Sequence, residues 1–143
     1  MTKMRFGALL GVALWALWSV AFVAPANALL PPSHIVFLST GSAEIRQAGD
    51  NVLREVASTF HKIGIKARVF IGAHTDSAEA QSLSATLSSE RGTAAKQRLI
   101  ELGIPADRIW ISVYGDSRPW VITPAGSPQP QNRRAEIVVA LPE

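Results

Sequence analysis

The sequence predicts a two-layer α/β domain in β-α-β-α-β-β order, with the helices packed on one face of a mixed sheet. Four short runs are rich in β-branched and aromatic residues, as strands are. Two longer segments between the first three runs carry apolar residues at helical spacing, and glycine or proline ends each of them. Elements in this order build two layers around one core, and the first two connections are long enough for right-handed βαβ crossovers.

Each expected strand is a short apolar run bounded by turn residues. In the second, Ala67, Val69 and Ile71 alternate with polar or outward-facing neighbours, which is the pattern of a half-buried strand. The four expected strands are His34–Ser39, Lys66–Ile71, Arg108–Tyr114 and Ala135–Leu141.

Two helices are expected, over residues 46–63 and 83–102. The first places Val52, Val56 and Phe60 on one face and ends at Gly64. The second has Leu83, Leu87, Ala94, Ala95, Leu99 and Leu102 on its inner side and stops before Gly103 and Pro105. Residues 75–82 and 115–131 are expected to be loops, and the second of these contains four prolines and two glycines.

The first 28 residues have the three parts of a secretory signal peptide. Lys3 and Arg5 precede an apolar stretch over residues 6–24, and Ala26-Asn27-Ala28 matches an A-x-A cleavage site. The apolar stretch is nearly long enough to span a bilayer, so an uncleaved anchor is the alternative. Both interpretations place residues 29–143 across the membrane, with 29–33 as a short lead-in and 34–143 as one domain.

Composition excludes several classes of function. Removing Lys3 and Arg5 from the 14 basic residues leaves 12 against 11 acidic ones, and there is no basic run, so a nucleic-acid partner is not expected. The chain has no cysteine and therefore no disulfide, thiol nucleophile or thiolate metal site. Its three histidines lack metal-binding spacing, and neither a metal nor a cofactor is expected.

One acid and one base are the leading candidates for a binding site. Asp76 follows the second strand, and Arg91 lies on the second helix between core-facing positions. Together they could hold a ligand that carries both an ammonium and a carboxylate group. Two structural interpretations stay open: Asp76 as an Asx-turn or helix cap, and Arg91 in a salt bridge to Asp76 or Glu90.

Two further basic residues, Arg133 and Arg134, open the last strand. Adjacent strand residues face opposite sides, so one arginine can reach the site while the other is solvated. A basic strand start that shields a sheet edge explains the pair equally well.

Five motifs occur in order from about Ile35 to Val139, and together they resemble the OmpA-like peptidoglycan-binding domain family. The motifs are His74-Thr75-Asp76, Leu87-Ser88-x-x-Arg91, Gly103-Ile104-Pro105-Ala106-Asp107-Arg108-Ile109, Gly115-Asp116-Ser117-Arg118-Pro119 and Asn132-Arg133-Arg134-Ala135-Glu136-Ile137. The resemblance implies an OmpA-C-like fold and non-covalent binding of the diaminopimelate in the wall's peptide stem. Together with the expected signal peptide, the resemblance implies a location in the periplasm or cell envelope of a Gram-negative bacterium. Association with the outer membrane stays open.

The resemblance also implies a role for individual residues. Asp76 would take the ligand ammonium and Arg91 the carboxylate, because charge-assisted hydrogen bonds and the planar guanidinium suit these tasks. Thr75 and the backbone near it would orient the ligand, and His74 would also be a ligand-binding residue. Ser84 stands at a second ligand position, and Arg133 or Arg134 would assist.

Five positions depart from the family pattern: Ala73 and Glu79 replace glycines, Leu83-Ser84 replaces Tyr-Asn, and Gly92 replaces alanine. Glu79 adds a negative charge near the expected site. The departures motivate an alternative, in which the same fold serves as an interaction module for other envelope proteins. An enzyme is not expected: His74 and Asp76 are too close on an extended segment for a His–Asp contact, and no G-x-S-x-G motif occurs.

Overall fold

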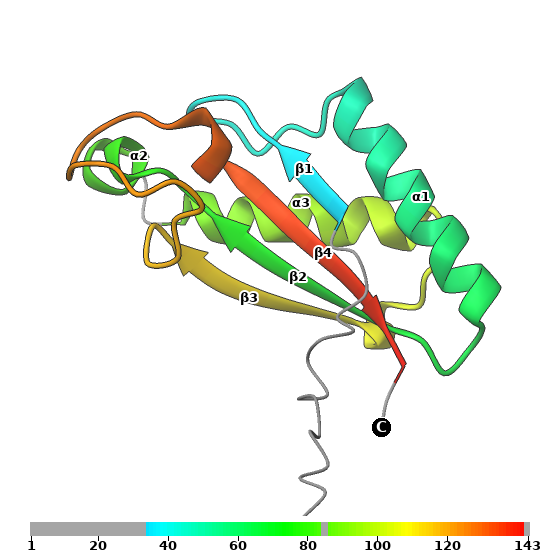
Figure 1. Ribbon diagram of the computed structural model, residues 1–143. Helices are drawn as coiled ribbons and strands as arrows, with labels where there is room; N and C mark the ends of the chain where they lie inside the picture. The colour runs from blue at the N-terminus through cyan, green and yellow to red at the C-terminus, as the bar shows by residue number, and fades with distance from the viewer. Residues whose placement is uncertain (1–33, 84–85, 142–143) are drawn as a thin grey trace, which may run out of the picture.

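The four strands of one mixed sheet form the centre of the computed structural model, which describes residues 34–83 and 86–141 (Figure 1). Their order is β1-β4-β2-β3. The central strand β4 runs antiparallel to both β1 and β2, while β2 and β3 are parallel. The strands are β1 (His34–Phe37), β2 (Arg68–His74), β3 (Ile109–Gly115) and β4 (Arg134–Ala140).

Two long helices, α1 (Gln47–Ile63) and α3 (Leu87–Glu101), cover one face of this sheet (Figure 1). A short helix, α2 (Ser77–Ser82), follows β2 at the end of the sheet, and two 3-10 turns span Ala106–Arg108 and Pro130–Asn132. The predicted two-layer α/β fold with a mixed sheet is therefore confirmed. No helix within the described ranges has both the length and the apolar character needed to cross a membrane.

The core lies between the two helices and the covered face of the sheet. Each large aliphatic side chain fully buried there contributes roughly 1.5–3 kcal/mol. Val69 and Ile71 are buried on β2 as the alternating pattern predicts, whereas Arg68 and Phe70 are exposed. The other large buried side chains of this core are Val36, Leu38, Leu53, Val56, Phe60, Leu99, Ile104, Ile109, Ile137 and Val139.

The boundaries at both ends of α2 differ from the prediction. β2 continues through Gly72 to His74, because this glycine pairs with Glu136 on one side and Ser112 on the other. The expected loop over residues 75–82 contains α2, and the next helix starts at Leu87 instead of residue 83. Leu83, expected on the inner side of that helix, is exposed.

The long loop between β3 and β4 is held by hydrogen bonds of Asn132. Its Oδ1 accepts from the backbone N–H of Trp120 at 2.8 Å and of Val121 at 2.9 Å, while its Nδ2 donates to Val121 O. A further contact joins the loop to α2, where Gly126 N donates to Ser77 Oγ. This docking places the loop against the end of the sheet that carries Asp76.

Candidate functional site

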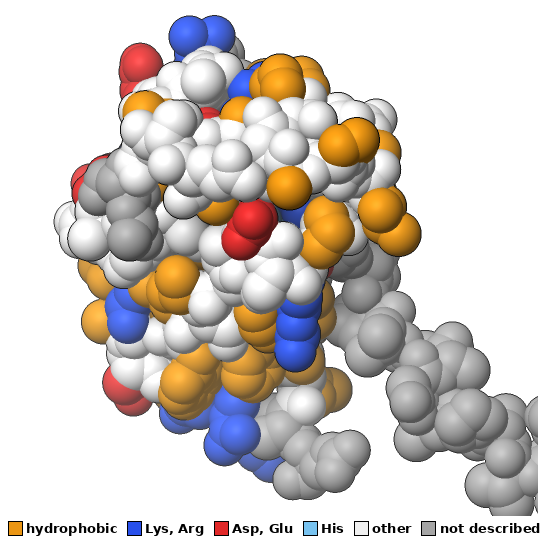
Figure 2. Space-filling view, turned by 90° about the vertical axis from the view of Figure 1, so that its left-hand side faces the viewer, with side chains coloured by type: hydrophobic (Ala, Val, Ile, Leu, Met, Phe, Trp, Pro, Cys, Tyr) orange, Lys and Arg blue, Asp and Glu red, His pale blue; other side chains and the backbone are white. Residues whose placement is uncertain are grey.

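The motif residues converge where β2 ends, α2 begins and the β3–β4 loop folds back. Figure 2 views the molecule from this end, where charged side chains are scattered among hydrophobic and uncharged ones. Asp76, Glu79 and Arg91 are all buried. Three full charges out of water require close partners, and the structure supplies them.

Asp76 caps helix α2 and is fully buried. Its Oδ1 accepts from the backbone N–H of Glu79 at 2.8 Å, as in a capping box. Its Oδ2 accepts from Gln129 N at 2.9 Å and lies 3.3 Å from Arg133 Nη1. The helix-cap interpretation is confirmed, and both carboxylate oxygens already have protein partners.

Arg91 uses every N–H of its guanidinium inside the protein. Nε donates to Ser42 O at 3.0 Å, Nη1 to His74 O at 3.0 Å and Nη2 to Ser39 O at 2.9 Å. The two remaining donors form a fork on the carboxylate of Glu79, at 2.7 and 2.8 Å. A guanidinium has five N–H donors, so this side chain is saturated.

Glu79 receives four donors on its two carboxylate oxygens. Oε1 accepts from Arg91 Nη2 and from the backbone N–H of Gly41 at 2.9 Å. Oε2 accepts from Arg91 Nη1 and, more weakly, from the N–H of Asp76 at 3.3 Å. Side-chain exposures of 0% for Arg91 and 1% for Glu79 make this a fully desolvated ion pair.

The acid partner of Arg91 is therefore neither of the two that the sequence suggested. Asp76 pairs with Arg133, and Glu90 accepts from Thr86 Oγ1 on the surface of α3. The structure brings Asp76 and Arg91 to one place, but their charges are compensated separately. Glu79, expected as an extra negative charge near the site, lies between them and contacts both.

Thr75 and His74 reach the site mainly through their backbone. Thr75 is buried, and its N–H donates to Gly115 O at 2.9 Å. His74 offers its carbonyl to Arg91, whereas its ring lies on the open face of the sheet against Tyr114. Ser88 of the Leu-Ser motif donates to Ala73 O at 2.7 Å and accepts from Gly115 N, which fixes α3 to both strand ends. Ser84 lies outside the described residues.

Arg133 and Arg134 do point to different sides, as predicted. Arg133 reaches Asp76 and also donates to Thr40 Oγ1 at 2.6 Å. The expectation that the other arginine is solvated is wrong, because Arg134 is buried, binds Glu136 at 2.7 Å and donates to Arg118 O. Shielding of a sheet edge is also wrong, because β4 is an inner strand.

We call the buried charges Asp76, Glu79 and Arg91, together with Arg133, the ion network. A hollow of about 240 Å³ is lined by Ser77 and Asn132, the chain neighbours of Asp76 and Arg133, and by no residue of the network itself. We call it the loop-end hollow. It is lined by Ser77, Asp116, Pro119, Ile122, Thr123, Ala125 and Asn132. Asp116 is exposed and is the one charged residue in its lining. The hollow therefore offers an acid and apolar walls, and the buried charges lie outside its lining.

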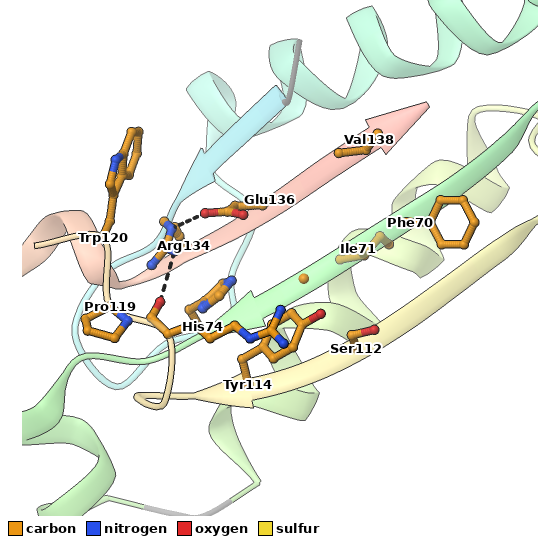
Figure 3. Close-up of a pocket in the computed structure, with 12 residues that line it drawn as sticks. Phe70, Ile71, His74, Ser112, Tyr114, Pro119, Trp120, Arg134, Glu136 and Val138 are labelled. Carbon is orange, nitrogen blue, oxygen red and sulfur yellow. Dashed lines mark hydrogen bonds and ion pairs between the residues drawn. The ribbon is translucent and has the colours of Figure 1, made fainter. Parts of the chain in front are cut away.

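A second hollow, of about 390 Å³, lies on the sheet face that no helix covers (Figure 3). We call it the open-face hollow; its lining includes Phe70, His74, Tyr114, Arg118, Trp120, Arg134 and Glu136. Burial of the His74 ring, with the positive charge of Arg134, lowers its pKa to about 4, although Glu136 acts in the opposite direction. His74 is thus neutral at pH 7. Sequence motifs identified this ring as a site residue, but its side chain belongs to the other face.

Three contributors to the ion network could not be identified from local sequence. The carbonyls of Ser39 and Ser42 and the N–H of Gln129 are backbone groups, so no side-chain pattern marks them. One signal was available: an acid three residues after Asp76 is the pattern of a capping box. Within the described ranges, no group of three or more His, Asp or Glu side chains could hold a metal ion.

Two curated proteins are similar in sequence to this chain. The chain is 32% identical over 117 residues to a photosystem I P700 chlorophyll a apoprotein A2 of Gloeobacter violaceus, covering 78% of this chain and 13% of that protein. It is 27% identical over 113 residues to an outer membrane protein of Gluconacetobacter diazotrophicus, covering 75% and 30%. It thus spans less than a third of the length of either relative.

Among solved structures, the peptidoglycan-associated lipoprotein of Burkholderia pseudomallei superposes with a TM-score of 0.63 at 20% identity, covering 75% of this chain and 90% of that one. At this identity the likeness concerns the fold. The model of the OmpA family matches residues 37–134, which include every motif described above except the end of the last one. The chain belongs to the OmpA family.

Proposed function

We propose that this domain binds peptidoglycan non-covalently, through the diaminopimelate of the peptide stem. The observation that supports the proposal is the meeting of Asp76, Arg91 and Arg133 at the end of β2, joined through Glu79 and the Asp76–Arg133 pair. A zwitterionic amino acid needs both signs of charge within one small volume. This end of the sheet supplies both signs of charge. The chain belongs to the OmpA family, and its fold is like that of a peptidoglycan-associated lipoprotein.

In this proposal the guanidinium of Arg91 binds a ligand carboxylate, and Asp76 takes the ammonium. Asp116 at the wall of the loop-end hollow supplies a second anion for a ligand with two amino groups. The apolar walls, Pro119 and Ile122 among them, suit the aliphatic chain between the two ends of diaminopimelate. Arg133 pairs with Asp76, so it assists indirectly.

The proposal makes the domain a tether for the cell wall and not an enzyme. In the same proposal residues 1–28 direct export, residues 34–143 form the wall-binding domain, and the protein resides in the cell envelope. The curated relative named as an outer membrane protein supports this location.

The test is co-sedimentation of the full-length chain with purified sacculi. Asp76→Asn keeps the size of the side chain but removes its charge, and Arg91→Lys keeps the charge but removes the guanidinium fork. We expect each variant to weaken binding about 5- to 150-fold, equivalent to about 1–3 kcal/mol. Matched controls are Glu55→Gln and Arg54→Lys, two exposed residues of α1. Unchanged sedimentation of folded Asp76→Asn and Arg91→Lys would overturn the site.

A second candidate function is favoured by the Glu79–Arg91 pair. Because this pair leaves Arg91 with no free donor, the fold could serve as an interaction module for another envelope protein. Cross-linking in cells separates the two: a specific protein adduct without sacculus binding supports the module, and sacculus binding without an adduct supports the tether.

A further inference from the structure

We propose that Glu79 acts as a built-in ligand, whose carboxylate occupies the place on Arg91 that a wall carboxylate would take. The inference rests on the proposed wall binding and concerns which residue sets its strength. Glu79 then sets the affinity of the site, because a ligand carboxylate binds Arg91 only by displacing it.

The environment of Glu79 has the form of a carboxylate receptor. Four N–H groups from three segments converge on its two oxygens: the fork of Arg91 on α3, Gly41 N on the β1–α1 loop and Asp76 N at the end of β2. The guanidinium is oriented by the carbonyls of Ser39, Ser42 and His74, independently of Glu79. Removal of the glutamate carboxylate would therefore leave three of the five donors of Arg91 still bound.

Among the side chains of α2, Glu79 alone occupies these donor groups. Within this helix, Glu79 is the only buried residue, and its backbone N–H binds Asp76 Oδ1. Position 79 is the third residue of α2, from which a glutamate reaches back to the cap. A glycine or alanine at this position has no carboxylate, so the receptor would be open to a carboxylate from outside.

Competition between the internal and external carboxylates sets the expected effect. The internal one is held at very high effective concentration, because it is part of the same chain. Removing it should raise the affinity for diaminopimelate by at least about tenfold, which corresponds to about 1.4 kcal/mol. The same removal leaves a buried guanidinium without its counter-charge, so the free variant should be less stable until a ligand binds.

The experiment compares the full-length chain with Glu79→Ala, and with Glu55→Ala as the matched loss of an exposed glutamate on α1. Two quantities are measured: sedimentation with diaminopimelate-type sacculi, and the melting temperature with and without free meso-diaminopimelate. We expect tighter sedimentation for Glu79→Ala and a ligand-dependent rise in its melting temperature. Glu55→Ala should match the parent. If Glu79→Ala does not fold, Glu79→Gln keeps the shape, removes the charge and should shift binding in the same direction.

The outcomes separate this inference from the proposed function. Sedimentation of the parent with equal or weaker sedimentation of both position-79 variants overturns the inference and leaves wall binding intact. Sedimentation by a position-79 variant alone supports the inference and refutes wall binding by the natural chain. No sedimentation of any form, with no ligand effect on any melting temperature, overturns both.

Discussion

The ion network around Arg91 and the open-face hollow lie on opposite sides of the same strand end. His74 belongs to both, since its carbonyl binds Arg91 and its ring lines the hollow. The network holds the family's charged residues but has every polar group of Arg91 and Asp76 partnered. The hollow has space and aromatic surface but a lining acid, Glu136, that already binds Arg134.

Residues proposed to bind a ligand thus lie apart from the hollow beside them, since neither Asp76 nor Arg91 is in its lining. In the network, a ligand would have to replace a protein partner of Arg91 or Asp76. Without a ligand, the charges of the network therefore act only on the stability of the fold. In the open-face hollow, nothing has to be displaced, so its residues should contribute less to stability and nothing to recognition of diaminopimelate. Substitutions on the two sides should therefore have effects of different size and kind.

The largest expected effect is on the network. Arg91→Ala leaves Glu79 buried without its cation, and breaking a buried pair in this way costs about 3–5 kcal/mol. Urea denaturation should show this loss in the free energy of unfolding. Arg54→Ala, which removes an exposed partner of Asp50, should cost about 0–1 kcal/mol. Equal losses in the two variants would contradict the structural role of the network.

The next effect concerns pH and the open-face hollow. The pKa of His74 is about 4 in the folded protein, below its ordinary 6.5, so the unfolded state binds more protons between these values. Stability from this group is therefore complete above about pH 6.5, falls as the pH drops toward 4, and changes no further below that. The expected loss is about 2–3 kcal/mol.

His74→Gln should lack this part of the pH dependence. Unfolding free energies of the parent and the variant, measured from pH 7 to pH 4, give the contribution as a difference. Parallel profiles would show that the His74 ring is not held neutral by its burial.

A smaller effect is expected where α3 approaches the sheet below the network. A Cβ on Gly92 would lie 2.7 Å from Ile111 Cγ2 and 3.3 Å from Ala73 Cβ. Gly92→Ala should therefore destabilise the domain by about 1–2 kcal/mol through overpacking, despite the better helix propensity of alanine. Thermal denaturation measures it. Adding Ile111→Ala to Gly92→Ala removes the atom that clashes, so the double variant should lose less stability than the sum of the two single variants. A loss equal to that sum would refute the overpacking.

The smallest effect is expected at the rim of the open-face hollow. Trp120 is half exposed, stacks on Phe37 and lies under the guanidinium of Arg134. Trp120→Ala should cost about 1 kcal/mol and leave sacculus sedimentation unchanged. Trp110→Ala, at the other end of the same face, is the control. Loss of wall binding in Trp120→Ala would assign recognition to this face instead.

The sequence predicted the long elements because their periodicity is local. The helix expected over residues 46–63 is α1, Gln47–Ile63, and the alternation around Val69 marks the buried face of β2. Helix α2 was missed because six residues are too few to show an apolar period. The end of β2 was misplaced because Gly72, which resembles a stop signal, continues the ladder on both sides.

The candidate site was predicted in position but not in its pairing. Family motifs bring Asp76, Arg91 and Arg133 together, as expected. The choice of Glu79 as the partner of Arg91 depends on the meeting of α2, α3 and the β1–α1 loop, which no local spacing encodes. Burial of Arg134 likewise depends on the β3–β4 loop, through Arg118 O and Trp120.

The most direct test of wall recognition is competition by free meso-diaminopimelate. The full-length chain is sedimented with diaminopimelate-type sacculi over a range of competitor concentrations, with lysine as the control competitor and lysine-type sacculi as the control wall. Recognition of diaminopimelate predicts binding to the first wall only, and its loss with meso-diaminopimelate but not with lysine. Equal binding to both walls, or binding that meso-diaminopimelate leaves unchanged, would contradict it.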